Sequence, residues 1–521
     1  MVSRIILLSS LACVALSSVS YSQTDKESHP NSPVFKNYQP PTTAPLLEQS
    51  DATYQLWQGF RVLQQANAGD AVSQFELSIR YLTGRGFKAD TGKAAYWTKK
   101  SAEQNHLLAR YNLAIFQFNG WGTEWNPFDA YRNFRFVAER NIPEARYVLA
   151  QFLTENLVVP KNWDEAYRWV KMAADSGYAP AKETLKEFEK RGYHLSGDSS
   201  SAQSSSTTGD SQQASQNSGA IQLSFLNFSP DTVKAPTDSV LFDDALKAAM
   251  LSRNREVQRM FGSMNISSEQ FEIDSSALRF LFRSAEAGSP EALTLLGRCY
   301  ERGIRVEKDI ILAAMSYARA IRLGSPRAGR LLYNLIQEKD FFDVLRQRVN
   351  RNDAHAMYVW SCLVALGFDR QLTDSQALQM LERAVVHNHP QAMIELGLCY
   401  YSGRWTKRSE QKAEELWRQA ANVGSSEANV RLAIVKIRGK GKDYAFAIPV
   451  VKQAASEGSV LAEFALAYCY ETGSGVLRNK AEAVRLYRSS GQRGSQDAFR
   501  ALQRMHDDIR PKEKQFQIVD R

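Results

Sequence analysis

A 36-residue repeat constrains the fold of this chain more than any other feature of its sequence. Small residues open an apolar helical pattern at regular intervals, and most of these intervals are 36 residues long. The small residues are Ser73, Ala109, Ala145, Ala181, Ala292, Ala328, Ala356, Ala392, Ala428, Ala462 and Ala498. Periods of roughly 20–50 residues are typical of arrays in which each unit buries its apolar face against the next. The 521-residue chain is therefore expected to form extended arrays rather than one conventional core.

Two helix stops divide each unit. Eleven residues after the small residue stands a Gly or Asn, such as Gly84 or Asn156, and both types tolerate the left-handed backbone that ends a helix. Six residues further on stands a side chain, such as Asp90 or Asn126, that can accept a hydrogen bond from the free N–H groups of a first helical turn. A second Gly or Asn, such as Gly177, closes the unit. The pattern predicts two helices in every repeat and an all-α chain.

Two units depart from this spacing. The step from Ala328 to the next small residue is only 28 residues, so we expect an irregularity in the array there. In the unit of Gly439, the expected helix cap, Asp443, comes two residues early, which accounts for a step of 34 residues.

The clearest units contain the motifs Leu296-Gly297-x-x-Tyr300-x-x-Gly303 and Leu396-Gly397-x-x-Tyr400-x-x-Gly403. With these motifs the chain resembles the Sel1-like repeat family, a relative of the tetratricopeptide (TPR-like) repeat, over residues 51–194 and 270–505. The resemblance implies a right-handed α-solenoid of helix-turn-helix repeats, in two arrays joined by a flexible linker. It also implies a scaffold or adaptor role in protein complexes, and exported bacterial members often act at the cell envelope or in host interaction.

Composition separates the repeats from the other segments. Residues 195–235 are rich in Ser and Gln, and we expect a linker there because such a stretch buries too little apolar surface to fold. Residues 23–50 are Pro-rich and are expected to form a disordered tether. The N-terminal array is expected over residues 51–194, the C-terminal array over residues 236–505, and a tail over residues 506–521.

The first 22 residues have the composition of a secretory signal peptide. Arg4 precedes an apolar run from Ile5 to Leu16, and small residues follow, with a cleavage position before Gln23. No later segment is long and apolar enough to span a bilayer. The mature chain is therefore expected to be periplasmic or secreted, without an integral membrane span, and the sequence leaves bacterial and eukaryotic origin open.

The sequence offers little for catalysis. It contains no zinc-protease motif, no nucleophile elbow and no phosphate-binding loop, so we expect neither an enzyme nor a bound cofactor or metal. His387 and His389 form a close pair, which we expect at a solvated helix end. The formal charge of +9 is modest for this length, and no nucleic-acid partner is expected.

Four cysteines follow the signal segment: Cys299, Cys362, Cys399 and Cys469. Equivalent positions in adjacent repeats lie roughly 10 Å apart, whereas a disulfide needs Cα atoms within about 7 Å of each other. Cys299, Cys399 and Cys469 occupy one equivalent position in units that are not adjacent. We therefore expect free, buried thiols.

Two surface features are candidate binding sites. Trp121 and Trp125 fall in the turn of the aromatic second unit, where burial is harder to arrange. They either belong to the core, as some aromatic residues of this unit must, or are exposed anchors for a partner, which is the binding hypothesis. The turns that follow the first helices are basic, at Arg305, Lys308, Arg404, Lys407 and Arg408. Stacked repeats would align these cations in a stripe that attracts an acidic protein surface or an anionic glycan. Alternatively, the cations only complement the dipoles of the helices that end there.

The favoured function is a non-catalytic scaffold or adaptor for protein–protein interactions in the cell envelope or outside the cell, with host interaction as one setting. A second hypothesis is a protein that binds an envelope glycan such as peptidoglycan, or that regulates a glycan enzyme. A third is an enzyme whose site lies in the atypical residues 221–270, although no motif there supports it.

Overall fold

The computed structural model describes residues 56–190 and 275–518, apart from residues 326, 370, 440 and 441, together with seven residues between 241 and 271. The chain divides into two compact units, which are described separately. Among the described residues, unit 1 contains 56–190 and 500–518, and unit 2 contains the remainder up to residue 499. The expected signal peptide (1–22), tether (23–50) and linker (195–235) lie outside the described residues.

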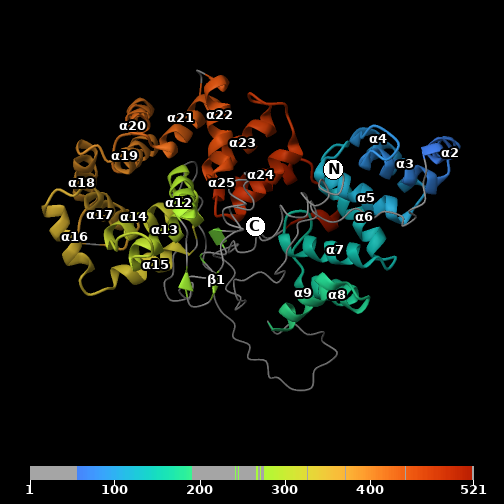
Figure 1. Cartoon of the computed structure of the whole chain (residues 1–521), viewed down its shortest axis with the longest axis horizontal. Coiled ribbons are helices and arrows are strands. Elements are labelled where there is room, and N and C mark those ends of the chain that lie inside the picture. Colours follow the sequence, from blue (N-terminus) through green and yellow to red (C-terminus); the bar gives the residue numbers. More distant parts are fainter. Residues whose placement is uncertain are drawn as a thin grey trace. The chain divides into compact units, whose positions relative to one another are not determined.

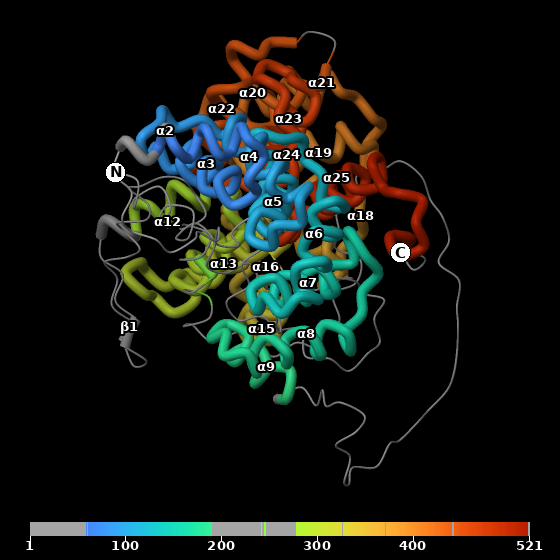
Figure 2. Tube along the Cα trace, turned by 90° about the vertical axis from the view of Figure 1, so that its right-hand side faces the viewer, coloured from blue at the N-terminus to red at the C-terminus, as the bar shows by residue number. Residues whose placement is uncertain are grey.

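Unit 1 contains the N-terminal array, whose successive helices form a chain of hairpins (Figure 2). Its helices are α2 (Leu56–Asn67), α3 (Ala71–Thr83), α4 (Thr91–Glu103), α5 (Leu107–Asn119), α6 (Pro127–Ala138), α7 (Pro143–Glu155), α8 (Trp163–Asp175) and α9 (Ala179–Lys190). Each helix packs mainly against its neighbours in sequence, which is the arrangement of a solenoid.

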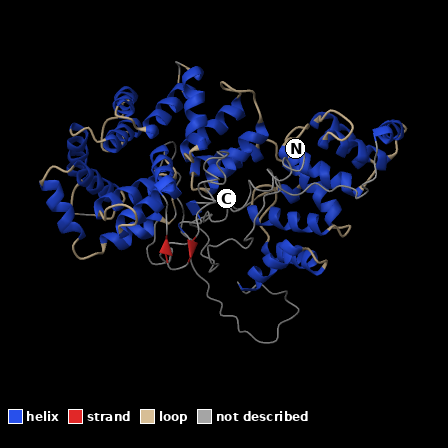
Figure 3. Ribbon diagram, viewed as in Figure 1, coloured by secondary structure: helices blue, strands red, loops and turns tan. Residues whose placement is uncertain are grey.

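Unit 2 contains the C-terminal array. Its helices are α12 (Ser275–Ala287), α13 (Pro290–Arg302), α14 (Ile310–Arg322), α15 (Ala328–Ile336), α16 (Phe341–Asn350), α17 (Ala354–Ala365), α18 (Asp374–Val386), α19 (Pro390–Ser402), α20 (Glu410–Asn422), α21 (Ser426–Arg438), α22 (Tyr444–Ser456), α23 (Val460–Thr472) and α24 (Lys480–Gln492). The predicted helical solenoid is confirmed for both arrays (Figure 3). Besides the helices, the described residues include one antiparallel pair of two-residue strands, β1 (Ile266–Ser267) and β2 (Gln270–Phe271). None of the described helices has the length and apolar character needed to cross a membrane.

The predicted turn chemistry is confirmed. Gly84 and Gly303 end α3 and α13 in the left-handed region, at φ values of 74° and 72°. Asn156 takes the same conformation after α7, at φ 54°. The side chain of Asp90 caps α4 by accepting a hydrogen bond from the backbone N–H of Lys93 at 2.9 Å. These stops and caps fix where each helix begins and ends.

Both irregular units have a visible cause. Gly439 is extended, at φ −73° and ψ 176°, instead of left-handed, and Asp443 caps α22 early through the backbone N–H of Phe446 at 3.1 Å. The unit of Ala328 consists of the short helices α15 and α16, with nine and ten residues. Beside this shortened hairpin, α17 packs directly against α14.

Glycines set the closest approach between the two helices of a repeat. A Cβ atom at Gly297 would lie 2.5 Å from a ring carbon of Tyr317, and one at Gly397 would lie 2.4 Å from the indole nitrogen of Trp417. These distances leave no room for a side chain. The aromatic ring of the second helix therefore lies directly on the backbone of the first.

The C-terminal array curves until its two ends meet. Helix α12 packs against α21, and Figure 1 shows the chain passing through α16 and α19 before it returns to α12 at α21 and α22. The turns at Gly324 and Gly494 touch, because a Cβ atom at Gly324 would lie 2.5 Å from the carbonyl oxygen of Gly494. One superhelical turn thus brings the first and last repeats of unit 2 into contact.

The C-terminal segment does not simply extend unit 2. Helix α25 (Gln496–Asp507) begins in unit 2, and from Arg500 onward the chain belongs to unit 1. Residues 500–518 belong with the N-terminal array.

Candidate peptide-binding site

The C-terminal segment, residues 509–518, lies on one face of α6. This helix starts where the side chain of Asn126 accepts a hydrogen bond from the backbone N–H of Phe128 at 3.1 Å. The start places Phe128, Tyr131 and Arg132 at positions i, i+3 and i+4, so they share a face of the helix. This face and the turn that follows α7 are called the cradle below.

Phe516 is the apolar anchor of the segment. It lies in the 3-10 turn η2 (Lys514–Phe516) and is 0 % exposed. Its ring packs edge-to-face against Phe128 and Tyr131, with ring centroids 5.2 Å and 5.8 Å apart. The guanidinium of Arg132 lies 5.0 Å from the centre of the same ring. Aromatic pairs of this kind add roughly 0.5–1.5 kcal/mol each beyond burial, so the cradle holds this ring firmly.

Arg510 fixes the other end of the segment to the backbone of the array. Its guanidinium donates hydrogen bonds to the carbonyl oxygens of Leu157 at 2.7 Å and Val158 at 3.2 Å, in the turn after α7. It also donates to the carbonyl oxygen of Phe516 at 2.7 Å. One side chain thus joins both ends of the segment to the cradle.

A charged pair lies on the solvent side of the cradle. Arg132 pairs with Glu513 of the segment and with Asp129 of its own helix. Hydrogen bonds from Gln515 and Arg132 hold the pKa of the Glu513 carboxyl below its ordinary value. Because the pair is exposed to solvent, it orients the segment more than it stabilises it.

The two tryptophans of the aromatic turn differ in their burial. Trp125 is only 7 % exposed, and its ring packs edge-to-face against His506 at 5.1 Å. Of the two alternatives, Trp125 therefore takes the buried one, because the C-terminal residues of the same chain cover it. Trp121 is half-buried and lies 6.3 Å from the ring of Phe116.

The predicted basic residues are exposed, but they belong to two separate turns. Arg305 and Lys308 lie between α13 and α14, and Arg404, Lys407 and Arg408 lie between α19 and α20. Among the described residues, no hydrogen bond or ion pair joins the two groups.

Two contacts occupy part of the second basic turn. Arg404 donates to the carbonyl oxygen of Ala365 at 3.0 Å, and Arg408 pairs with Glu410 at 2.7 Å.

Arg305 and Trp405 take φ values of 56° and 61°. Other repeats place a glycine at this position of the turn.

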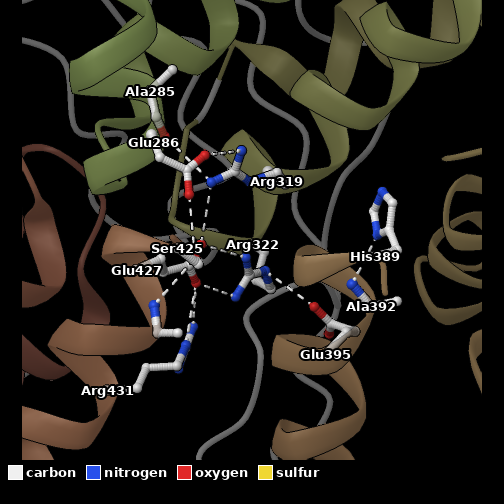
Figure 4. A network of polar contacts seen from close by, with 11 residues as sticks. Ala285, Glu286, Arg319, Arg322, His389, Ala392, Glu395, Ser425, Glu427 and Arg431 are labelled. Carbon is white, nitrogen blue, oxygen red and sulfur yellow. Dashed lines mark hydrogen bonds and ion pairs between the residues drawn. The ribbon is translucent and has the colours of Figure 1, made fainter. Parts of the chain in front are cut away.

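A buried ion-pair network lies where unit 2 meets itself (Figure 4). Glu427 of α21 is 0 % exposed and accepts hydrogen bonds from Arg322 at 2.7 Å and 3.0 Å. Arg431 donates to the same carboxylate at 2.8 Å and 3.2 Å, and Arg319 lies 3.5 Å from it. Arg322 also pairs with Glu395 at 3.2 Å. The network joins α14 to α19 and α21.

The helix ends explain why these charges meet. Glu427 lies in the first turn of α21, and Arg319 and Arg322 lie in the last turn of α14. Carboxylates are favoured at helix N-termini and cations at C-termini, and the curvature of the array brings these two ends together. Burial alone would raise the pKa of Glu427, but Arg322, Arg431 and Arg319 together hold it well below its ordinary value.

A second charged contact closes the same superhelical turn. Arg493 pairs with Glu291 at 2.7 Å and with Glu463 at 3.2 Å, and it donates to the carbonyl oxygen of Gly458 at 2.6 Å. Glu291 belongs to the first full repeat of unit 2, whereas Glu463 and Arg493 belong to the last. These charges serve the closure of unit 2, so the cradle of unit 1 is the better candidate for binding a partner.

The part of the chain that the structure describes contains neither a metal-binding cluster nor an exposed cysteine. No group of three or more His, Cys, Asp and Glu side chains there is placed to hold a metal ion. As predicted, Cys299, Cys362, Cys399 and Cys469 form no disulfide and are buried. Burial raises the pKa of Cys399 to about 12 and that of Cys469 to about 11, so both remain protonated thiols.

His389 corrects the expectation of a solvated histidine pair. His387 is exposed, but His389 is buried and caps α19 by accepting a hydrogen bond from the backbone N–H of Ala392 at 3.1 Å. Burial, followed by repulsion from His355 and Arg319, lowers the pKa of His389 to about 3. The neutral ring therefore serves as a helix cap.

Comparison with known proteins identifies the repeat. The Sel1 repeat family model matches residues 71–106, 107–141, 143–178, 290–325, 390–425 and 460–495. The shortened hairpin that starts at Ala328 and the unit of Gly439 lie outside these matches.

Similar proteins cover only parts of the chain or resemble it weakly. DAP3-binding cell death enhancer 1 is 35% identical in Rattus norvegicus and 32% identical in Mus musculus, each over 100 residues that make up 19% of this chain and 20% of the relative. The chain thus spans about one fifth of the length of these curated relatives.

Two solved structures are similar as well. A protective antigen of uropathogenic Escherichia coli strains, with an SLR fold, is 18% identical and has a TM-score of 0.30, over 86% of this chain and 82% of that chain. A Sel1 repeat protein from Oxalobacter formigenes is 28% identical and has a TM-score of 0.24, over 25% of this chain and 96% of that chain.

Proposed function

Because this chain is a Sel1-like repeat protein, we propose that it is a non-catalytic scaffold whose N-terminal array binds segments of other proteins. Sel1 repeats are generally protein-interaction scaffolds. The rat and mouse relatives are named for binding DAP3, and from that name we carry over only the binding of a protein.

The observation that supports this proposal most directly is the occupied cradle. The array holds a short segment, residues 509–518, through one buried ring and one arginine that donates hydrogen bonds to backbone carbonyl groups. Aromatic anchors in pockets, combined with main-chain hydrogen bonds, are the common means by which proteins recognise peptides. A surface that binds one such segment has the chemistry to bind another.

The setting we propose is the periplasm or the exterior of the cell, including contact with a host. Arg4, the apolar run from Ile5 to Leu16 and the small residues before Gln23 support export. Detection of a mature N-terminus at Gln23 after expression in a secreting cell would support this location. Retention of an intact N-terminus in the cytoplasmic fraction would contradict it.

A second candidate function is binding of an anionic envelope glycan, because the cations of the two basic turns are exposed. Reversing Arg404, Lys407 and Arg408 to Glu would then abolish salt-sensitive retention on purified peptidoglycan. Unchanged retention, or no retention of the unaltered protein, would remove this candidate.

Site-specific crosslinking of the full chain in its native compartment tests the scaffold proposal. A photoreactive residue is placed at Arg135, which lies three residues beyond Arg132 on α6 and whose side chain is 42% exposed. The control carries the same residue at Leu477, an exposed position in a turn of unit 2. We expect discrete proteins, identified by mass spectrometry, to crosslink at Arg135 and not at Leu477. An absence of protein crosslinks at Arg135, or the same products at both positions, would contradict the proposal.

A further inference from the structure

We propose that the cradle is specific for a partner segment with an acidic residue three positions before an aromatic residue, and that residues 509–518 are its resident occupant. This inference rests on the proposed scaffold function and names the chemistry of the partner. In the resident segment, Glu513 and Phe516 supply the acidic and aromatic residues, and Arg510 stands three positions before Glu513.

The turn after α7 indicates that the cradle is built to be covered. Leu157, Val158 and Val159 form an apolar turn. Val158 stands where other repeats carry an exposed Gly86, Gly122, Arg305 or Gly475, and Leu157 stands where two of them carry the exposed Arg85 and Arg404. All three are buried, and Val158 and Val159 share a core cluster with Phe516. An apolar turn in solvent would be unfavourable, so this turn requires an occupant that the turns of neighbouring repeats do not need.

The segment itself has the properties of a bound peptide. Apart from the single turn η2 it has no regular structure. Its main anchors to the array are the ring of Phe516, the guanidinium of Arg510 and the carboxylate of Glu513. Such a segment is held by side-chain recognition, so another segment with the same side chains fits the same surface.

The chemistry of the cradle restricts the partner. The ring pocket, formed by Phe128 and Tyr131 beneath Arg132, takes an aromatic residue whose π-face meets a cation. Arg132 selects a carboxylate about one turn earlier, as Glu513 shows. The backbone carbonyl groups of Leu157 and Val158 accept hydrogen bonds from a donor further upstream, as Arg510 shows. The cradle is therefore matched to a basic, then acidic, then aromatic residue at three-residue spacing.

The resident segment sets the threshold for a partner. A segment joined to its own site by the chain has an effective concentration in roughly the millimolar range. A partner segment present at a lower concentration must therefore bind more tightly than the resident one, or act when the resident segment is weakened. Weakening the resident segment should raise the affinity for an added peptide.

A peptide-binding measurement on the full chain tests this. The probe is a fluorescent synthetic peptide of residues 509–518, and its binding is followed by fluorescence anisotropy. We expect the Phe516→Ala protein to bind the peptide at least about tenfold more tightly than the unaltered protein does. A peptide with Phe516→Ala should not bind, and Arg132→Ala in the Phe516→Ala protein should weaken binding at least about threefold.

Two further variants test whether a change in peptide affinity comes from release of the segment or from loss of folding. Glu513→Lys changes an exposed side chain and replaces its pairing with Arg132 by repulsion, which weakens the hold on the segment, so it should also raise peptide affinity, by less than Phe516→Ala does. Phe446→Ala removes an exposed aromatic ring from unit 2 and should leave peptide affinity unchanged. Equal affinity in the unaltered, Phe516→Ala and Glu513→Lys proteins would overturn the proposal, and so would an absence of binding in all three.

The outcome separates this inference from the proposed function. If no protein binds the peptide while Arg135 still crosslinks to other proteins, the scaffold function stands and the cradle is only a structural contact. If the peptide binds as expected but no protein crosslinks at Arg135, the cradle binds peptides and the scaffold function fails.

Discussion

The two arrays are built from the same repeat but make their closing contacts with different chemistry. The N-terminal array packs aromatic rings, among them Phe118 and Phe152 at 5.4 Å, and holds the C-terminal segment with a further ring. The C-terminal array meets itself through buried charges around Glu427 and Arg493. Apolar contacts tolerate exchange of one occupant for another, whereas buried ion pairs tolerate no missing member. The first array is therefore suited to ligands and the second to one fixed geometry.

Removal of the Glu427 carboxylate should have the largest effect on the contacts that close the C-terminal array. Glu427→Gln leaves Arg319, Arg322 and Arg431 buried around a neutral group, and loss of one partner from a buried ion pair typically costs about 3–5 kcal/mol. We expect the free energy of unfolding of unit 2 to fall by about that amount in urea titrations followed by hydrogen exchange. Amides of the N-terminal array should keep their protection.

An exposed carboxylate provides the matched control. Glu410 pairs with Arg408, and both side chains are more than half exposed, at 62% and 64%. Glu410→Gln should change the free energy of unfolding by no more than about 0.5 kcal/mol. An equal loss from both substitutions would show that burial does not distinguish the two pairs.

Acid should weaken the closure of the C-terminal array. The folded-state pKa of Glu427 is held below its ordinary value, so its stabilising contribution is complete above the unfolded-state value of about 4.3 and is lost as the pH falls below it. The difference in unfolding free energy between the unaltered protein and Glu427→Gln should therefore shrink between pH 5 and pH 3, by roughly 1.4 kcal/mol for each pH unit below about 4.3. The pKa of Glu463 is raised by burial and acts in the opposite direction, but it cancels in this difference. A difference that stays constant over this range would contradict the ionised state of Glu427.

The anchor of the C-terminal segment tests the other side of the comparison. Phe516→Ala removes a buried ring, and truncation of a core Phe typically costs 3–5 kcal/mol. Because the segment can leave the cradle without unfolding the array, we expect a smaller loss of about 2–3 kcal/mol. Hydrogen exchange should increase near Phe128 and in the turn after α7, with no change in unit 2. Loss of protection throughout the N-terminal array would instead show that the segment is part of its core.

The fold could be predicted because the residues that start and end each helix lie within the repeat itself. Glycines such as Gly84, caps such as Asp90 and the early cap Asp443 act within a few residues, so the sequence alone places them. The cradle could not be predicted in this way, because Phe516 and Phe128 are far apart in the sequence and the tail carries no repeat motif. An apolar ring beyond the last repeat was the available signal.

The ion-pair network was hidden for a similar reason. Glu427 and Arg322 each look like ordinary charges near a helix end, favoured there by the helix dipole. Only the curvature of the array turns them into buried partners, and curvature depends on the summed geometry of several repeats. The sequence likewise left the burial of Trp125 open, because the covering residue, His506, is distant in sequence.

A local substitution in a turn of the C-terminal array should produce the smallest effect. Arg305 is exposed and holds φ 56°, where Gly475 holds φ 71° in the last repeat. A side chain in the left-handed region costs roughly 1–2 kcal/mol, and glycine loses roughly 0.5–1 kcal/mol more backbone entropy on folding. Arg305→Gly should therefore stabilise unit 2 by roughly 0.5 kcal/mol in urea titrations. Gly475→Ala should act in the opposite direction and more strongly, because its Cβ would also lie 2.8 Å from Tyr444. If Arg305→Gly instead destabilises unit 2, the arginine makes a contact that stabilises unit 2 by more than the strain of its left-handed backbone costs.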